Sequence, residues 1–236
     1  RETYRNPFAN RDIQATEPLT LLPAQQNALE KIKSADAGSC LLLHGVTGSG
    51  KTEVYMQAIA NVLENGGGAI VLVPEISLTP QTTDRFRSRF GNNVAVLHSH
   101  LSDGERFDEW RRIRFGKARV VVGARSAVFA PVENLRIIII DEEHEPSYYS
   151  EITPKYSAAE VALRRVKICG AKLVLGSATP SLTTYYRAKR GRYILLEMPN
   201  RINGVPMPKV DIVDMREEFL SGNNSIFSVR HLKQYV

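Results

Sequence analysis

The chain has few cysteines, no long apolar run and no internal repeat. Only two of its 236 residues are cysteines, Cys40 and Cys169, so a disulfide framework and a four-cysteine zinc site are both excluded. Each adjoins an apolar run, which predicts two buried free thiols, and such sparing use of cysteine favours a reducing, cytoplasmic location. No apolar run approaches the roughly 20 residues that span a bilayer, so we expect no membrane partner.

An initiating methionine and an export signal are also missing. Residues 1–10 contain no apolar core, which argues against a signal peptide, and we expect a piece cut from a longer protein. Residues 1–20 are polar and aperiodic, as in a linker or arm from a preceding domain. Residues 21–198 have the pattern of a folded domain. The proline-rich stretch that follows predicts a connector over 199–236, with one short strand at 209–214.

Charge narrows the partners only a little. The net charge of +6, from 31 basic and 25 acidic residues, is compatible with a polyanionic partner such as nucleic acid. Many proteins are this basic, so charge alone does not decide. Hydrophobic residues make up 43%, which is enough for a core that needs no disulfide or metal.

Short apolar runs alternate with amphipathic stretches along the chain. The runs are rich in Val, Ile and Leu and barely alternate, as in strands covered on both faces. The predicted strands are 40–44, 69–73, 94–98, 119–123, 136–141 and 172–176. The predicted helices are 23–33, 52–65, 80–90, 102–115, 158–167 and 181–190, with Thr79 and Ser102 as N-caps. This alternation predicts an α/β fold with a mostly parallel sheet and helices on both faces.

The segment from Gly45 to Thr52 matches the phosphate-loop pattern G-x-x-x-x-G-K-[ST]. It follows a predicted strand and opens a predicted helix, as the pattern requires. Its glycines let successive N–H groups face phosphate oxygens, and the helix amino terminus adds partial positive charge. We expect Lys51 to reach the β- and γ-phosphates of ATP and the Thr52 hydroxyl to bind Mg²⁺. The candidate nucleotide contacts are Gly45, Thr47, Gly48, Ser49, Gly50, Lys51 and Thr52.

Four isoleucines run into an acidic segment, Asp141, Glu142, Glu143 and His144. A buried strand that ends in carboxylates places them at the edge of the sheet where ligands bind in α/β proteins. Asp141 is suited to hold Mg²⁺ through its water shell, and Glu142 can take the proton from an attacking water beside the nucleotide. Lys51, Asp141 and Glu142 are therefore the catalytic candidates. A solvated acidic loop is the alternative reading.

Ser177, Ala178 and Thr179 follow another predicted strand. Alone, this tripeptide fits a helix-capping turn equally well. The order of phosphate loop, Asp-Glu-x-His and Ser-Ala-Thr nevertheless resembles helicase superfamily 2. That resemblance implies a RecA-like P-loop NTPase lobe in which Ser177 and Thr179 couple the nucleotide state to movement on nucleic acid, and in which His144 contacts a neighbouring lobe or nucleic acid.

Longer strings narrow the resemblance. PEISLTPQ at 74–81, GARSAVF at 123–129 and GVTGSGKTEVY at 45–55 are similar to the first motor lobe of the PriA family of primosomal replication-restart helicases. The likeness extends over about 22–198, although Glu143 stands where many relatives carry Ala. It implies an ATP-dependent 3′→5′ DNA helicase that acts at stalled forks and promotes primosome assembly. It also implies ATP and Mg²⁺ as cofactors, with zinc only in the full-length protein.

The same resemblance assigns contacts to individual residues. Gln26, in a segment similar to the Q-motif, is the candidate adenine reader, with an exposed helix residue as the alternative. DNA contacts are expected at Ser77, Thr79, Arg125 and Ser126, and at the aromatic-rich segment with Tyr148, Tyr149 and Tyr156. Surface tyrosines and a solvated loop arginine remain open, and His98 and His100 are weaker candidates. The implied partners are single-stranded and forked DNA, other primosome proteins and single-strand-binding proteins.

Three other functions remain to be weighed. Another superfamily 2 repair or recombination translocase is the nearest alternative. A nucleotide kinase or transport ATPase would share the phosphate loop but would lack the 123–129 and 177–179 segments. A non-catalytic module is disfavoured because Lys51, Thr52, Asp141 and Glu142 are all intact. Since no second lobe with its arginine finger follows, we expect this chain alone to bind ATP weakly and hydrolyse it poorly.

Overall fold

The computed structural model describes residues 14–99, 101–202, 212–223 and 225–228. The chain divides into two compact units between residues 204 and 205. The first unit contains all of the strands found in the described residues, and the second contains the short helix α7 (Met215–Leu220). The site described below belongs to the first unit. Among the described residues, no helix is long and apolar enough to cross a membrane.

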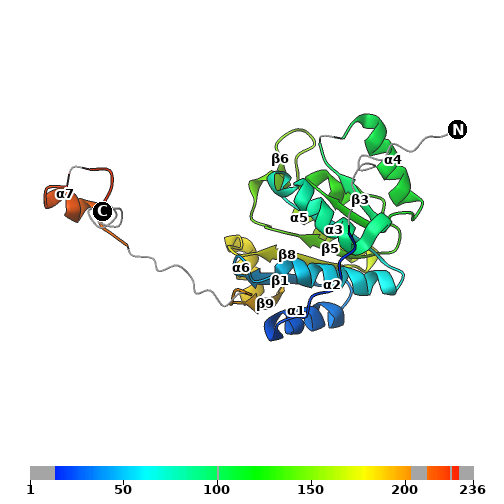
Figure 1. Cartoon of the computed structure of the whole chain (residues 1–236), viewed down its shortest axis with the longest axis horizontal. Coiled ribbons are helices and arrows are strands. Elements are labelled where there is room, and N and C mark those ends of the chain that lie inside the picture. Colours follow the sequence, from blue (N-terminus) through cyan, green and yellow to red (C-terminus); the bar gives the residue numbers. More distant parts are fainter. Residues whose placement is uncertain (1–13, 100, 203–211, 224, 229–236) are drawn as a thin grey trace. The chain divides into compact units, whose positions relative to one another are not determined.

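A seven-stranded sheet forms the centre of the first unit (Figure 1). Its strand order is β3 (Val94–Leu97), β4 (Val120–Gly123), β2 (Gly68–Leu72), β5 (Leu135–Ile140), β8 (Lys172–Ser177), β1 (Cys40–Gly45) and β9 (Ile194–Met198). Every neighbouring pair is parallel. The inner strands are buried almost throughout, because helices cover both faces and uninterrupted Val, Ile and Leu runs fill the two cores.

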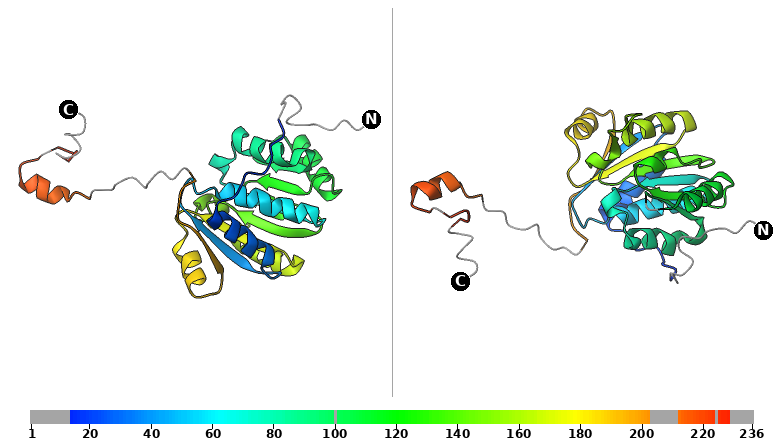
Figure 2. Two further views of the ribbon diagram at one scale, coloured as in Figure 1. Left: turned by 60° about the horizontal axis from the view of Figure 1, so that its bottom comes forward. Right: turned by 90° about the horizontal axis from the view of Figure 1, so that it is seen from above.

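Three helices cover each face of this sheet. On one face lie α1 (Pro23–Ser34), α2 (Lys51–Glu64) and α3 (Pro80–Phe90), side by side in Figure 2. On the other lie α4 (Asp103–Arg114), α5 (Ala158–Cys169) and α6 (Leu182–Lys189). The predicted α/β lobe with helices on both faces is therefore confirmed.

The short elements all lie in the connections. Four 3-10 helices occur in the described residues: η1 (Glu75–Ser77), η2 (Gly91–Asn93), η3 (Arg125–Phe129) and η4 (Pro146–Tyr148). Two short strands, β6 (Tyr149–Ser150) and β7 (Tyr156–Ser157), pair as an antiparallel hairpin with two residues in each strand. Except for η2, which precedes β3, these elements follow the carboxyl ends of parallel strands. The polar connections therefore gather at one edge of the sheet.

The structure differs from the sequence predictions at Cys169 and at β9. Cys169 ends α5 and is exposed, because the helix runs two residues further than predicted and its last turn faces solvent. β9 was not predicted, since its residues are only partly buried at the sheet edge. A strand expected over 209–214 falls mainly outside the described residues, and residues 212–214 form no strand.

Candidate nucleotide site

The phosphate loop joins the carboxyl end of β1 to the first turn of α2. Gly48 and Gly50 adopt φ values of +81° and +83°, which glycine tolerates far better than other residues. A Cβ on Gly50 would also collide with the side chains of Gln25 and Ile202. Ser49 is buried, and its Oγ has no hydrogen-bond partner in the protein. The loop is thus a tight turn that contains one buried hydroxyl, that of Ser49, without a hydrogen-bond partner.

Lys51 lies directly behind this turn. Its side chain is buried, and its Nζ donates to the Gly45 carbonyl at 2.9 Å. The same Nζ lies 3.7 Å from Oε1 of Glu142. The phosphate loop and the acidic segment therefore meet across one site, as predicted from their places at the ends of β1 and β5.

Asp141 is oriented by a buried tyrosine on α2. The Tyr55 hydroxyl donates to its Oδ1 at 3.0 Å. Burial, and next the charge of Glu142, raise the pKa of the Asp141 carboxyl, while Tyr55 and Lys51 act against this. A Cβ on Gly176 would overlap the Tyr55 hydroxyl, so glycine at 176 leaves the room for this contact. A cation at this carboxylate would favour its charged form.

Glu142 has an unusual backbone for a residue with a side chain. Its φ is +45°, and Asn134 is the only other non-glycine residue with positive φ in the described parts of the chain. Such conformations cost about 1–3 kcal/mol and cluster at functional sites. One third of its side chain is exposed. The strained turn therefore presents the carboxylate to the site instead of the core.

A cavity of about 610 Å³ connects these groups. It is lined by residues 47–53 of the phosphate loop, by Asp141 and Glu142, and by Arg85, Arg89 and residues of the segment before α1. Its size falls within the roughly 300–1,000 Å³ of small-ligand pockets. Lys51 supplies the positive charge of this lining at the phosphate loop, as a phosphate chain requires.

The glutamine beside the phosphate loop is Gln25, not Gln26. Gln25 is buried, donates from Nε2 to the Ser49 carbonyl at 2.9 Å and accepts at Oε1 from Leu22 N–H at 2.8 Å. Gln26 is exposed and donates to Glu30. Successive helical residues point about 100° apart, so the assignment of Gln26 as adenine reader is corrected. Gln25 is the residue of this pair that contacts the phosphate loop.

Glu53 anchors the walls of the cavity to one another. It is buried and receives a two-pronged contact from Arg89 of α3 at 3.0 and 3.1 Å. It also accepts from Leu19 N–H at 3.1 Å, while Gln57 donates to the Leu19 carbonyl at 2.8 Å. The segment before α1 is thereby tied to the helix that begins at Lys51.

The acidic segment is joined to the Ser-Ala-Thr segment by two sets of contacts. His144 Nδ1 lies 2.9 Å from Ser177 Oγ, and His144 Nε2 lies 3.5 Å from Thr179 Oγ1. Buried Glu143 accepts from Ser181 N–H at 2.6 Å and from the Thr184 hydroxyl at 3.0 Å. The structure therefore places His144, Ser177 and Thr179 together. It also adds Glu143, which sequence reasoning left without a role.

The aromatic segment is only partly a surface. Tyr148 is 2% exposed, and its hydroxyl donates to the Asp141 carbonyl at 2.7 Å. Its predicted DNA contact is therefore corrected, because neither ring nor hydroxyl faces solvent. Tyr149 is exposed. Tyr156 is half-buried, with its ring 5.1 Å from that of Phe129.

Arg125 binds this segment. Its Nη1 donates to the carbonyls of Ser147 and Tyr149, and its guanidinium lies 5.7 Å from the centre of the Tyr156 ring. Much of its donor capacity is therefore used within the protein.

The other predicted DNA contacts lie at the same edge of the sheet. Ser77, Thr79 and Ser126 are exposed. Thr79 also caps α3, with its hydroxyl accepting from Thr82 N–H. His98 follows β3, and His100 lies outside the described residues.

The residues present fit a magnesium–ATP complex. The Ser49 hydroxyl is buried without a hydrogen-bond partner in the protein, and Lys51 provides a buried ammonium group. Thr52 and Asp141 line the same cavity and offer the hard oxygen ligands that Mg²⁺ prefers. Tyr55, Glu143 and Gln25 were missed by sequence reasoning, because no local pattern links them to the loops they contact.

Comparison with known proteins agrees with this geometry. A model of the DEAD/DEAH box helicase family matches residues 22–188. The chain is similar to Replication restart protein PriA of Bacillus subtilis (strain 168), with 54% identity over 236 residues, covering 99% of this chain and 29% of that protein. It is also 49% identical over 226 residues to Replication restart protein PriA of Synechocystis sp., covering 94% of this chain and 27% of that protein.

A solved structure supports the fold alone. The helicase domain of Pyrococcus furiosus Hef aligns with a TM-score of 0.54 and 23% identity, covering 74% of this chain and 37% of that chain. The chain thus spans less than a third of the length of the two PriA proteins named above.

Proposed function

Since the chain belongs to the DEAD/DEAH box helicase family, we propose that it is the ATP-binding lobe of a DNA helicase that works in replication restart. The observation that carries this is the meeting of Lys51 and Glu142 across one cavity at the carboxyl ends of β1 and β5. Similarity to PriA proteins favours replication restart over a repair or recombination translocase, which is the second candidate.

The residues divide the work of hydrolysis among them. Bound Mg²⁺–ATP supplies the scissile phosphate bond and a cation that neutralises charge developing on its oxygens. The phosphate-loop amides and Lys51 hold the phosphates, and Thr52 and Asp141 hold the cation. Glu142 accepts the proton of the attacking water. Gln25 of α1 fixes the turn through its hydrogen bond to the Ser49 carbonyl.

Nucleic acid is proposed to lie along the same edge of the sheet. Exposed Ser77, Thr79, Ser126 and Tyr149 are suited to a strand held by its backbone and by stacking. Ser177, Thr179 and His144 would relay the nucleotide state, because His144 contacts both and lies 3.7 Å from Glu142. Unwinding with 3′→5′ polarity, forked DNA, primosome and single-strand-binding partners, a zinc site elsewhere in the longer protein and a cytoplasmic location remain proposals.

Two substitutions test the nucleotide site. Lys51→Ala should weaken ATP binding about 10- to 100-fold, because a buried charge-assisted contact is lost. Glu142→Gln should keep nucleotide bound and abolish turnover, since the amide cannot accept the proton. Nucleotide binding and ATPase rates of the full-length protein measure both.

The control and the DNA dependence complete this test. Glu133→Gln changes an exposed acid outside the cavity and should leave nucleotide binding and the ATPase rate unchanged. Single-stranded or forked DNA should stimulate the ATPase. An ATPase rate that is the same with and without DNA would instead favour a kinase or transport ATPase.

A further inference from the structure

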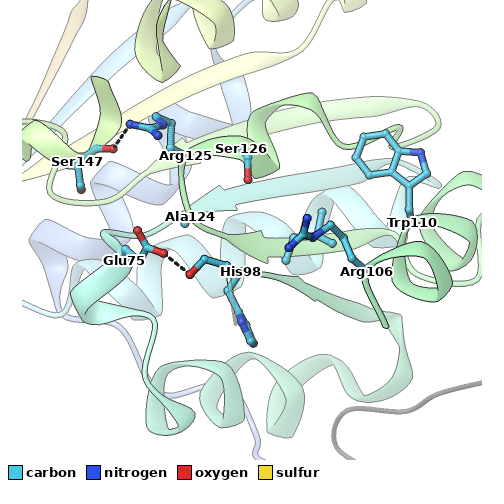
Figure 3. A pocket seen from close by; sticks show the side chains of 10 residues that line it. Glu75, His98, Arg106, Trp110, Ala124, Arg125, Ser126 and Ser147 are labelled. Atoms are coloured by element: carbon cyan, nitrogen blue, oxygen red, sulfur yellow. Dashed lines mark hydrogen bonds between the residues drawn. The ribbon is translucent and has the colours of Figure 1, made fainter. Parts of the chain in front are cut away.

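A second pocket opens beside the carboxyl ends of β3 and β4 (Figure 3). Its volume is about 410 Å³, within the range of small-ligand pockets. The residues that line it do not overlap with those of the nucleotide cavity. Its lining includes Glu75, Ser99, Arg106, Trp110, Arg125 and Ser126. None of the nucleotide chemistry described above uses this pocket.

Trp110 forms one wall of the pocket. It projects from α4, whose Ile113 and Glu109 face the core, and remains 40% exposed. Figure 3 shows its ring at one end of the hollow, which Arg106 and Ser126 also line. A partly exposed indole at a pocket gives an apolar face for a flat ligand.

The polar groups of the pocket are of two kinds. The Glu75 carboxylate accepts from the Ser99 hydroxyl and lines the hollow at the end away from Trp110 in Figure 3. It disfavours a phosphate there, but it can accept an N–H from the edge of a base. Arg106 is half-exposed, donates to the Leu101 carbonyl through Nη2 at 3.3 Å, and lies 3.7 Å from the carboxylate of fully exposed Asp103. Its charge at the border of the pocket suits a phosphate outside it.

We propose that this pocket holds one unpaired base of single-stranded DNA, stacked on Trp110, with Arg106 at the adjoining phosphate. Trp110 suits a flat ligand, the Glu75 carboxylate suits an N–H group on its edge, and Arg106 suits an anion beside it. In a duplex the base faces are already stacked, so only an unpaired base can present its face to Trp110. The proposal rests on the proposed function, and adds a binding site at Trp110 to the exposed serine and threonine contacts.

The ring itself can report binding. Trp110 is the only tryptophan among the 236 residues, so the tryptophan fluorescence of the chain comes from this wall. Titration with an oligothymidylate should change that fluorescence saturably, and the midpoint should shift to higher DNA concentration as salt rises. A blunt duplex of the same length should leave it nearly unchanged. An equal response to the duplex would overturn the assignment of an unpaired base.

Substitution and DNA chemistry then test stacking directly. Trp110→Ala should weaken binding of a labelled oligothymidylate about tenfold or more, and Trp110→Phe should retain most of the affinity. An oligomer of abasic sites should bind the unchanged chain more weakly by a similar factor, with no further loss in Trp110→Ala. Phe115→Ala is the matched control, because Phe115 is an exposed aromatic beside the end of the same helix, outside the pocket.

The outcomes separate this site from the proposed function. Trp110→Ala should bind a fluorescent ATP analogue as the unchanged chain does, which also shows that it folds. The base pocket would be overturned if oligothymidylate bound the unchanged chain without altering its fluorescence and bound Trp110→Ala with full affinity. The helicase proposal would still stand. Absence of DNA binding by both this chain and the full-length protein would overturn both. A fluorescence response to peptides but not to DNA would identify a protein-docking pocket instead.

Discussion

Tyr55 shows how a residue to which the sequence assigned no role can govern the site. Its hydroxyl is buried and donates to Asp141, the proposed magnesium ligand. Groups that orient a metal ligand typically contribute about 10- to 100-fold to metal affinity or activity. The orientation of Asp141 therefore depends on a helix that contributes the phosphate-loop threonine as well.

Tyr55→Phe removes only this hydroxyl. We expect the Mg²⁺ concentration needed for half-maximal binding of a fluorescent ATP analogue to rise about tenfold. Tyr186→Phe, at an exposed tyrosine on α6, is the matched control and should change nothing. An unchanged Mg²⁺ requirement in Tyr55→Phe would show that Asp141 is held without it.

At the scale of elements, Glu143 ties the acidic turn to α6. Its carboxylate accepts from the N-cap residue Ser181 and from Thr184 in the first turn. A carboxylate at this end of a helix also complements the helix dipole. The residue thus holds the turn that contains strained Glu142 against the element following the Ser-Ala-Thr segment.

Glu143→Ala leaves these donors without their acceptor. We expect the free energy of unfolding of the chain to fall by about 2–3 kcal/mol, since buried donors lose a charged partner. Urea denaturation measures this change. Glu151→Ala removes an exposed acid and should stay within about 0.5 kcal/mol of the unchanged chain. Equal effects from the two substitutions would contradict the anchoring role.

Helices and strands were predicted well where neighbouring residues along the chain determine them. Buried parallel strands read as continuous apolar runs, so six of them were found from the sequence. Thr79 and Ser102 were confirmed as N-caps, because capping depends on neighbours only a few residues apart. β9 was missed since a half-covered edge strand leaves no continuous run. The predictions for Gln26 and Tyr148 were wrong, because packing against distant segments decides which side of an element faces the site.

At the scale of the whole molecule, both pockets open at the same edge of one parallel sheet. The nucleotide cavity lies where β1 and β5 end, and the Trp110 pocket lies where β3 and β4 end. The segment from Ser147 to Tyr149 lies between them, joined to Arg125 on one side and to Asp141 through Tyr148 on the other. The two sites are therefore linked by direct contacts.

The chain alone should turn ATP over slowly. The two PriA proteins named above are more than three times as long, and in comparable systems an added arginine finger is worth about 10³–10⁵ in rate. We expect the 236-residue chain to hydrolyse ATP at least about 10³-fold more slowly than the full-length protein with DNA. Side-by-side steady-state assays measure the ratio. A ratio below ten would mean that this lobe completes the site by itself.

The unequal exposure of the two cysteines has a practical consequence. Burial raises the pKa of the Cys40 thiol to about 12, whereas Cys169 is exposed. Cys169 adjoins Gly170, which lies with Ile137 and Lys172 at the amino ends of β5 and β8. A maleimide would therefore attach to one native position on the edge opposite both pockets. Molecules immobilised on glass through it would all present those pockets to the solution, with no engineered handle.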